Sequence, residues 1–539
     1  MRVSILCVLL TMGCVVPVCL AGPAQQAAVN AGETIYRDGV LGSGKPLVAQ
    51  REGGLQMQGA DAACVNCHRR SGFGMTEGRI SVPPVAGQYL FTSDYRDLPY
   101  VETMRAKRKS SYTEASLARA IREGVDAAGR SFDYLMPRFA LNDDDMAALI
   151  DYLKGLDQHR VRGVSDTVLH FATIVTPDAD PVKRDGMLNV LQRYFDDKNA
   201  VPLGPTPRLS TSRKLRFMVN RRWQLHVWQL SGAADTWQEQ LKNHLAKEPV
   251  FAVVSGIGGE NWAPVHDFCE HQALPCLFPN VEAPPAGADG DFYSLYFSKG
   301  VLLEAGLMAR KILDAKPANG ATVTQIYRAG DSGEAGARAL AAVLRPQGIK
   351  VRSRALSASA KDHDITTALD QAAGTEILVL WLRPADIATL GPAPAASTAV
   401  YLSGLMGGLE RAPLPEAWRG RVQVAYPFDL PDKRIVGVDF ALGWFRIRSI
   451  PVVAPRVQSD TYLAIGLLSE TLSRMVDTFV PDYLIERMED MLDHRIITGY
   501  YPRLALATGQ RFASKGGYMV RFPEPKGTRV IADSGWIVP

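Results

Sequence analysis

A Cys-x-x-Cys-His segment at residues 64–68 constrains this chain more than any other feature of its sequence. Cys64 and Cys67 are separated by two residues, and His68 follows directly. This pattern is typical of covalent attachment of c-type haem, because two thiols at this spacing add across the vinyl groups and the adjacent imidazole binds the iron. The alternative is a redox-active cysteine pair that happens to precede a histidine, but 7 Cys and 9 His in 539 residues rarely form the pattern by chance. We predict one covalent haem c per chain, with His68 as the proximal iron ligand.

A second iron ligand is expected downstream, at Met136. A thioether ligand raises the haem potential, and the proline that follows Met136 stiffens the loop that presents it. Three other methionines are alternatives. Met146 is explained by the apolar face of a helix predicted over residues 142–156, Met75 lies too close to the attachment motif, and no proline follows Met104.

These residues together resemble the class I cytochrome c family. The matching features are Gly32 and Tyr36 in a Gly-x-x-x-Tyr helix, the Cys-x-x-Cys-His segment, the Met-Pro loop, and a C-terminal helix that carries Tyr152 and Leu153. The resemblance covers about residues 30–157. It implies an all-α cytochrome c domain that transfers electrons.

The N-terminus predicts export. A basic residue precedes an apolar run that ends in small residues, which indicates a signal peptide over residues 1–21, cleaved near its end or near Ala24. The alternatives are an uncleaved anchor and a lipoprotein modified at Cys14 or Cys19. Covalent haem attachment takes place on the outer side of the bacterial inner membrane, so we expect a periplasmic protein. No later stretch predicts a transmembrane segment.

The length and net charge of the chain limit the number of domains and the class of partner that we expect. A chain of 539 residues is too long for one domain. Its 47% hydrophobic and 22% charged residues are ordinary for a globular protein, and a net charge of +4 does not favour nucleic acid as a partner. A polar stretch over residues 158–167 predicts a linker after the haem domain.

Beyond the linker the chain alternates between predicted strands and helices. This order favours parallel sheets with helices on both faces. The predicted strands cover residues 169–175, 223–230, 250–254, 274–278, 323–327, 377–382 and 399–403, and the predicted helices cover residues 182–197, 235–246 and 299–313.

The alternating region resembles the type I periplasmic binding proteins, in particular the branched-chain amino-acid receptors. The stretches that carry the resemblance are residues 184–189, 253–256, 274–279 and 327–333. The resemblance implies a binding-protein-like domain over residues 168–535, with two α/β lobes, a hinge and a ligand in the cleft. The predicted fold class is therefore multidomain: an all-α cytochrome c domain followed by a two-lobed α/β module.

Two loops are candidates for the ligand site. Gly258, Gly259, Glu260 and Asn261 follow one predicted strand, and Asp331 follows another. Loops at the carboxyl ends of parallel strands are where open α/β sheets bind ligands. Receptors that bind amino acids usually place small or hydroxylated residues at the first loop, so a carboxylate there favours a different ligand. A dinucleotide-binding turn is the alternative, but the second half of its fingerprint is absent.

Two further cysteines, Cys269 and Cys276, remain outside the signal peptide and the haem motif. In an oxidising compartment we expect them to form a disulfide. Free thiols are the second alternative. A metal site with His266 and His271 is the third, because the spacing fits no standard zinc pattern.

Two classes of function are open. The first is electron transfer in the periplasm, with a module that docks a partner or binds a small molecule. The second is ligand binding or sensing, in which the haem reports redox state. The binding-protein resemblance implies a redox partner such as a PQQ-dependent dehydrogenase or another cytochrome, and the basic run at residues 105–109 is a candidate docking segment. An enzyme ranks third, because His68 and Met136 would leave no open position on the iron.

Overall fold

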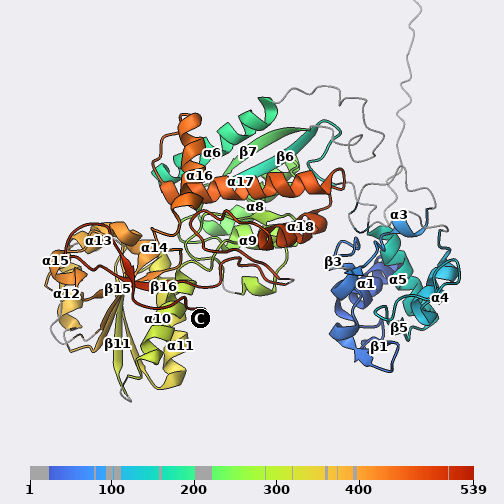
Figure 1. The fold of residues 1–539 in the computed structure, drawn as a ribbon, viewed down its shortest axis with the longest axis horizontal. Helices are drawn as coiled ribbons and strands as arrows, with labels where there is room; N and C mark the ends of the chain where they lie inside the picture. Colours follow the sequence, from blue (N-terminus) through green and yellow to red (C-terminus); the bar gives the residue numbers. More distant parts are fainter. Residues whose placement is uncertain are drawn as a thin grey trace, which may run out of the picture. The chain divides into compact units, whose positions relative to one another are not determined.

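The computed structural model describes residues 23–77, 80–92, 101, 103, 111–156, 161–200, 221–285, 287–317, 320–358, 362–372, 374–392, 397, 399–507 and 509–539. The predicted signal peptide, Met104 and the basic run at residues 105–109 lie outside these residues. The chain divides into two compact units, residues 1–159 and 160–539 (Figure 1). None of the described helices combines the length and the hydrophobicity that a membrane span requires.

The N-terminal unit is built from helices joined by long connections. Its helices are α1 (Pro23–Asp38), α2 (Val65–His68), α3 (Gly87–Leu90), α4 (Glu114–Glu123) and α5 (Asp143–Gly155). The structure adds short strands that the sequence pattern did not predict: β1 (Val48–Gln50), β2 (Gln56–Gln58), β3 (Thr76–Glu77), β4 (Ile80–Ser81) and β5 (Arg138–Phe139). Helix α5 confirms the helix predicted over 142–156, and its start is capped by Asn142, whose side chain accepts a hydrogen bond from the Asp145 amide at 2.8 Å.

Helices α1 and α5 cross where Gly32 faces Ala148 and Tyr152. A Cβ on Gly32 would overlap the Ala148 carbonyl oxygen and would lie 2.7 Å from the Tyr152 Cβ. The absent side chain therefore lets the two backbones approach closely. One turn later the rings of Tyr36 and Tyr152 lie 5.4 Å apart, and the Tyr36 hydroxyl donates to the Arg69 carbonyl at 2.7 Å. This crossing ties the first and last helices to the segment that follows His68.

The C-terminal unit contains two sheets, each in its own lobe. The five-stranded sheet of the first lobe has the order β10-β9-β8-β6-β7, and neighbouring strands are parallel. Its strands are β6 (Val168–Val175), β7 (Arg222–Gln229), β8 (Ala252–Val254), β9 (Cys276–Leu277) and β10 (Ser294–Leu295). Its helices are α6 (Pro181–Ala200), α8 (Trp237–Lys247), α9 (Ala263–His271), α16 (Ile435–Ile447), α17 (Pro455–Met475) and α18 (Pro481–Asp493).

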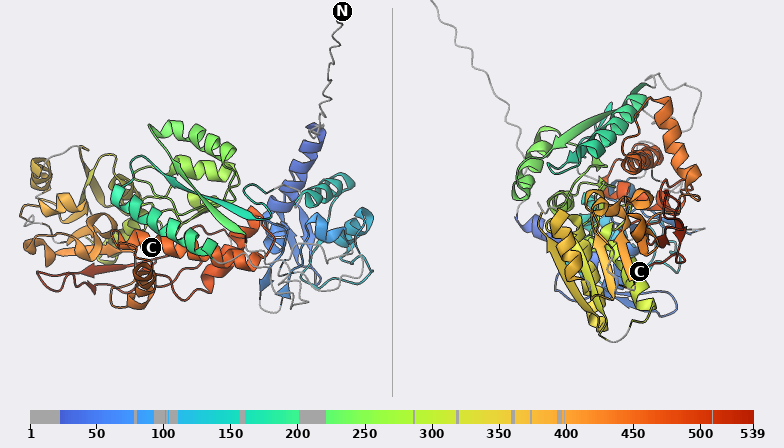
Figure 2. Two further views of the ribbon diagram at one scale, coloured as in Figure 1. Left: turned by 90° about the horizontal axis from the view of Figure 1, so that it is seen from above. Right: turned by 90° about the vertical axis from the view of Figure 1, so that its left-hand side faces the viewer.

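Strand β6 shows why helices cover both faces of this sheet. Alternate residues point to opposite faces of a strand. On one face, Ala172 and Ile174 belong to the buried cluster that includes apolar residues of α8 and α9. On the other face, the ring centroids of Phe171 and of Phe195 in α6 lie 6.0 Å apart. Helix α17, far along the chain, packs against α6 and β8, and Figure 2 shows α6 (teal) beside α17 (orange). The mostly apolar sequence of β6 thus reflects burial on two sides.

The seven-stranded sheet of the second lobe has the order β12-β11-β13-β14-β15-β16-β17. Its strands are β11 (Thr322–Arg328), β12 (Lys350–Leu356), β13 (Ile377–Trp381), β14 (Ala399–Ser403), β15 (Val422–Tyr426), β16 (Tyr518–Arg521) and β17 (Ile531–Ala532). The last two strands are antiparallel to their neighbours, so the sheet is mixed. Its helices are α10 (Val301–Asp314), α11 (Ser332–Leu344), α12 (Asp362–Gln371), α13 (Pro384–Ala388), α14 (Gly404–Gly407) and α15 (Glu416–Arg419).

The chain crosses between the lobes three times, after β10, after β15 and before β16. The crossing segments lie side by side: the Ala513 amide donates to the Tyr296 carbonyl at 3.0 Å, and the Asp429 amide donates to the Tyr500 carbonyl at 2.9 Å. The rings of Tyr296 and Phe512 stack at 5.2 Å. Three adjacent crossings connect the lobes, and their action as a hinge stays a prediction.

Candidate functional site

The Cys-x-x-Cys-His segment forms a single helical turn. Helix α2 starts after Cys64, and the amides of Cys67 and His68 both donate to the Cys64 carbonyl, at 3.2 and 2.9 Å. Residues three positions apart on a helix share a face, so the turn brings the two cysteines to one side. The Asn66 side chain holds the turn by donating to the Ala60 carbonyl at 2.8 Å. No disulfide joins the two cysteines in this structure.

A hydrogen bond to the backbone orients the ring of His68. Its Nδ1 lies 3.1 Å from the Pro83 carbonyl oxygen, and the residue is buried. Since a carbonyl oxygen only accepts hydrogen bonds, Nδ1 carries the ring proton and Nε2 carries the lone pair. A histidine held in this tautomer by its second nitrogen is suited to bind a metal ion.

Met136 is half-buried and packs, like Cys64, against the apolar core of the N-terminal unit. A tight turn presents it, because its amide donates to the Asp133 carbonyl at 3.1 Å. Met146 lies inside the same core, as its place on the α5 helix face predicted. The two thiols could bond to the haem vinyl groups, and the His68 imidazole and the Met136 thioether could bind the iron, so the residues present fit haem c. The assignment of Met136 as the second ligand stays a prediction.

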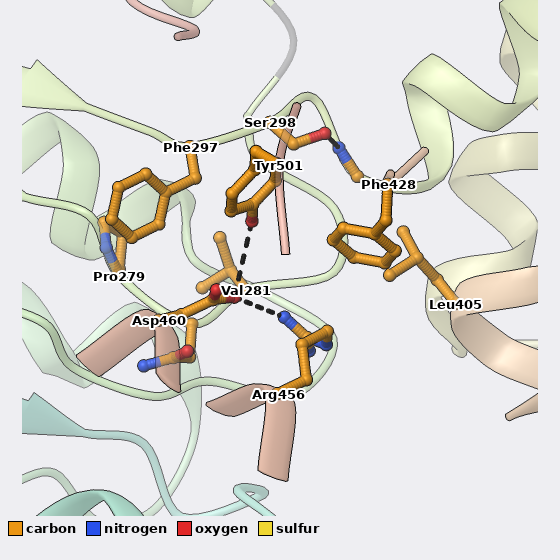
Figure 3. Close-up of a pocket in the computed structure, with 11 residues that line it drawn as sticks. Pro279, Val281, Phe297, Ser298, Leu405, Phe428, Arg456, Asp460 and Tyr501 are labelled. Atoms are coloured by element: carbon orange, nitrogen blue, oxygen red, sulfur yellow. Dashed lines mark hydrogen bonds and ion pairs between the residues drawn. The ribbon is translucent and has the colours of Figure 1, made fainter. Parts of the chain in front are cut away.

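A pocket lies between the lobes of the C-terminal unit, at the crossing segments (Figure 3). It is an open recess, in which protein atoms leave about 370 Å³ unfilled, open solvent included. It is lined by Pro279, Asn280, Val281, Phe297, Ser298, Gly300, Leu405, Phe428, Arg456, Asp460 and Tyr501. Residues from both lobes and from all three crossing segments therefore meet in one recess.

An ion pair on helix α17 forms one wall of the pocket. The Asp460 carboxylate accepts a hydrogen bond from Arg456 at 2.9 Å and another from the Tyr501 hydroxyl at 3.3 Å, and Figure 3 shows all three side chains together. Burial raises the pKa of Asp460 to about 6, although Arg456 and the Tyr501 hydrogen bond act in the opposite direction. These residues were not among the predicted site residues. Their only local signal is the i, i+4 spacing of Arg456 and Asp460, which predicts an ion pair but no site.

Ser255 lies at the carboxyl end of β8, and its hydroxyl forms hydrogen bonds within the first lobe. Its hydroxyl accepts a hydrogen bond from the Asn280 amide group at 2.9 Å and lies 3.2 Å from the Thr461 hydroxyl. All three residues are buried. Asn280, rather than Ser255, is the residue of this cluster that lines the pocket.

The loop predicted to bind ligand lies outside the pocket lining. Asp178 accepts hydrogen bonds from the amides of Gly259 and Glu260, at 3.3 and 2.8 Å. Gly258 packs closely on the Trp262 ring. The Asn261 side chain accepts a hydrogen bond from the Ala263 amide at 3.1 Å, at the start of α9.

Glu260 and Asp331 do approach each other, although they belong to different lobes. Glu260 lies beside Gly330, and burial together with the nearby Asp331 and Asp178 charges raises the pKa of Glu260. Asp331 accepts a hydrogen bond from the Arg383 guanidinium at 2.9 Å. The ligand-binding role of the five predicted loop residues stays a prediction.

Cys269 and Cys276 are buried and carry free thiols in this structure, so it contains no bond between them. A hydrogen bond connects the two side chains. Burial, and to a smaller extent this hydrogen bond, raises the pKa of Cys269. The disulfide stays a prediction. The alternative metal site gains no support, because His266 contacts Tyr296 and Asp291, and the described residues contain no group of three or more potential metal ligands.

Comparison with known proteins agrees with both resemblances. Residues 58–157 match the family model of cytochrome c. A comparison with curated proteins finds no match.

Among solved structures, the chain is similar to a branched-chain amino-acid ABC transporter protein from Thermus thermophilus with bound valine. The identity is 11%, the TM-score is 0.51, and 69% of this chain and 97% of that chain are covered. A substrate-binding protein from Aeropyrum pernix has 12% identity and a TM-score of 0.51, with 69% and 96% covered. A periplasmic substrate-binding protein from Ralstonia solanacearum has 12% identity and a TM-score of 0.50, with 68% and 100% covered. At these identities the likeness shows the fold.

Proposed function

Since residues 58–157 form a cytochrome c domain, we propose that this protein is a periplasmic c-type cytochrome that transfers electrons through one covalent haem. The observation that carries the proposal is the helical turn that aligns Cys64 and Cys67 beside a histidine whose ring is fixed by Pro83. The bound haem supplies one-electron chemistry. His68 and Met136 would both bind the iron and leave it no open position, which favours electron transfer over catalysis at the iron.

Haem attachment is tested on the exported protein. We expect one haem per chain from the pyridine haemochrome spectrum and a haem-stained band on a denaturing gel. The double variant Cys64→Ala, Cys67→Ala should lose the stain. The double variant Cys269→Ala, Cys276→Ala is the matched control, because it removes two cysteines outside the motif and should keep the stain. A stained band from the first variant would contradict the attachment site.

Electron transfer is tested by mixing the oxidised protein with a reduced periplasmic PQQ-dependent dehydrogenase or a second cytochrome. The haem should become reduced at a rate that depends on partner concentration. Failure of every such partner to reduce the haem, in protein that dithionite reduces fully, would contradict the electron-transfer function.

The pocket between the lobes favours a second role for the same protein, as a binder or sensor of a small molecule. The pocket lies at the three crossings, so a ligand there would contact both lobes at once. A ligand that binds only the closed form would stabilise the C-terminal unit by about 2.7 kcal/mol at a hundredfold excess over its Kd. A sensing role further requires that ligand binding shifts the reduction potential of the haem, which a redox titration measures.

A further inference from the structure

The outer face of helix α16 is apolar although it faces solvent. Val436, Phe440 and Ile447 are 75%, 53% and 75% exposed. The inner face packs on the first lobe through the buried side chains of Ala441 and Phe445, and Figure 1 shows α16 beside α17 at the edge of this lobe. A surface helix usually places polar residues opposite its buried face, so the exposed face of α16 is a candidate interaction surface.

The exposed apolar residues have the spacing of a coiled-coil seam. Val436, Phe440, Gly443 and Ile447 follow one another at intervals of four, three and four residues, which places them in one stripe along the helix. We call these four residues the α16 seam. Nothing lies within 4 Å of a Cβ added to Gly443, so the seam has room at this position for a side chain from a second helix.

Two opposite charges lie beside the seam on the same side of the helix. Asp439 and Arg446 are exposed, and their separation along the chain equals about two helical turns. Within the part of the chain that the structure describes, neither residue has an ion-pair partner. Arg448, on the opposite side of the helix, does have one, because it pairs with Asp197 at 2.8 Å. Asp439 and Arg446 are therefore available to a charged partner.

The order of these two charges distinguishes between partner orientations. When two copies of one helix pair in antiparallel orientation, residues on the same flank of the seam face each other. Asp439 of one copy then lies opposite Arg446 of the second copy, and the twofold symmetry repeats this pair. A parallel pair places each charge opposite the other flank, where Gly437 and Trp444 carry no charge. Charge complementarity therefore favours an antiparallel pair of identical chains.

The apolar seam fits the same arrangement. An antiparallel pair sets Val436 of one copy opposite Ile447 of the other, and Phe440 opposite Gly443. The largest side chain of the seam thus meets the position that has no side chain. The seam and the charges beside it select the same occupant, which is a second copy of this chain.

We propose that α16 is a dimerisation surface, where two copies of this chain pair through antiparallel α16 helices, seam to seam. The helix has 13 residues and is therefore about 20 Å long. A contact of this length buries less than the roughly 1,600 Å² of a standard stable interface. The dimer should therefore form and dissociate reversibly at micromolar concentrations. The proposal goes beyond electron transfer and small-molecule binding and depends on neither.

The association is tested by sedimentation velocity of the full-length, haem-loaded protein at micromolar to submillimolar concentrations. We expect one reversible equilibrium between monomer and dimer. Val436→Glu should weaken the dimer about tenfold or more, because the interface then buries a carboxylate opposite Ile447 of the second copy. Val343→Glu is the matched control. This valine is also exposed on a helix, α11 of the second lobe, and its replacement should leave the dissociation constant unchanged.

Charge reversal tests both the orientation and the identity of the occupant. Asp439→Arg and Arg446→Asp, each alone, place like charges opposite each other in an antiparallel dimer and should each weaken self-association several-fold. An equimolar mixture of the two variants should associate again, since every facing pair in the mixed dimer has opposite charges. The double variant Asp439→Arg, Arg446→Asp should also regain the affinity of the unaltered protein.

The melting curve and the haem spectrum of each variant, measured on the monomer, establish that it is folded. Three results would overturn the proposal. The first is a monomer at every concentration, in which case another segment of the chain or a different partner covers the seam. The second is a dimer equally stable in Val436→Glu and Val343→Glu, which would place the interface elsewhere. The third is a mixture of the folded charge variants that fails to associate, which would exclude the antiparallel pairing.

Discussion

The carboxylate of Glu282, in the segment that follows β9 of the first lobe, lies 2.7 Å from the guanidinium of Arg383 in the second lobe. Lys183 of the first lobe contacts the same carboxylate at 3.3 Å, and Arg383 also pairs with Asp331. Burial alone would raise the pKa of Glu282, but the two cations outweigh it and lower the pKa from 4.5 to about 2. An ion-pair chain thus connects the lobes beside the pocket.

The first prediction concerns this carboxylate. Its folded-state pKa is lowered, so its contribution to the free energy of unfolding is present above about pH 4.5 and is lost as the pH falls toward 2. The full shift corresponds to about 3 kcal/mol as an upper bound. Glu282→Gln should destabilise the C-terminal unit at pH 7 and lose most of this difference near pH 3, as measured by urea unfolding.

The control for this prediction is Glu416→Gln, which removes the carboxylate of an exposed pair with Lys526. Exposed pairs contribute little, so we expect a change below about 1 kcal/mol. Equal destabilisation by both variants, or a Glu282→Gln effect independent of pH, would contradict the role of the ion-pair chain.

The second prediction concerns the crossing of α1 and α5. Gly32→Ala should destabilise the N-terminal unit by about 1–3 kcal/mol, because the added methyl group overlaps Ala148 and Tyr152. Gly155→Ala, also in a helix, is the matched control, since nothing lies within 4 Å of its added Cβ. It should be neutral or stabilising by up to about 1 kcal/mol. Thermal unfolding followed at the haem absorption band compares the two, and equal effects would contradict the close packing.

The third prediction concerns the second iron ligand. Met136→Ala should remove the weak near-infrared sulfur–iron band of the oxidised protein and allow carbon monoxide to bind the reduced protein. Met146→Leu should keep the band, because Met146 is a core residue of α5. If the band survives in Met136→Ala but is lost in Met104→Ala, the ligand is Met104.

The fourth prediction concerns the cysteine pair of the first lobe. Protein isolated from the periplasm should have no thiol that labels under denaturing conditions, because Cys269 and Cys276 form a disulfide and the motif cysteines are bound to haem. Cys276→Ala should expose one thiol and lower the free energy of unfolding by roughly 2 kcal/mol. Two labelled thiols in the unaltered protein would show that the pair stays reduced.

Local sequence was sufficient where the chemistry depends on neighbouring residues. The attachment turn needs only residues 64–68, and the apolar spacing along α5 places Met146 in the core. The strand–helix alternation predicted seven strands of the two lobes within two residues, but it did not predict β10, β12, β15, β16 and β17. The apolar runs of β8 and β13 were readable because these strands are buried on both faces. Strand β9 is shorter than predicted, with two residues paired in the region 274–278.

The pocket could not be predicted in the same way. Asn280 comes from the loop after β9, Leu405 from the second lobe, and Asp460 from a helix that returns to the first lobe after the second crossing. A single chain without an alignment contains no local signal that joins such distant segments. The sequence by itself determined the haem motif and the order of the elements, since both depend on residues close in the chain. Only the tertiary structure decided which polar atoms meet between the lobes, because that depends on the three crossings that bring the lobes together.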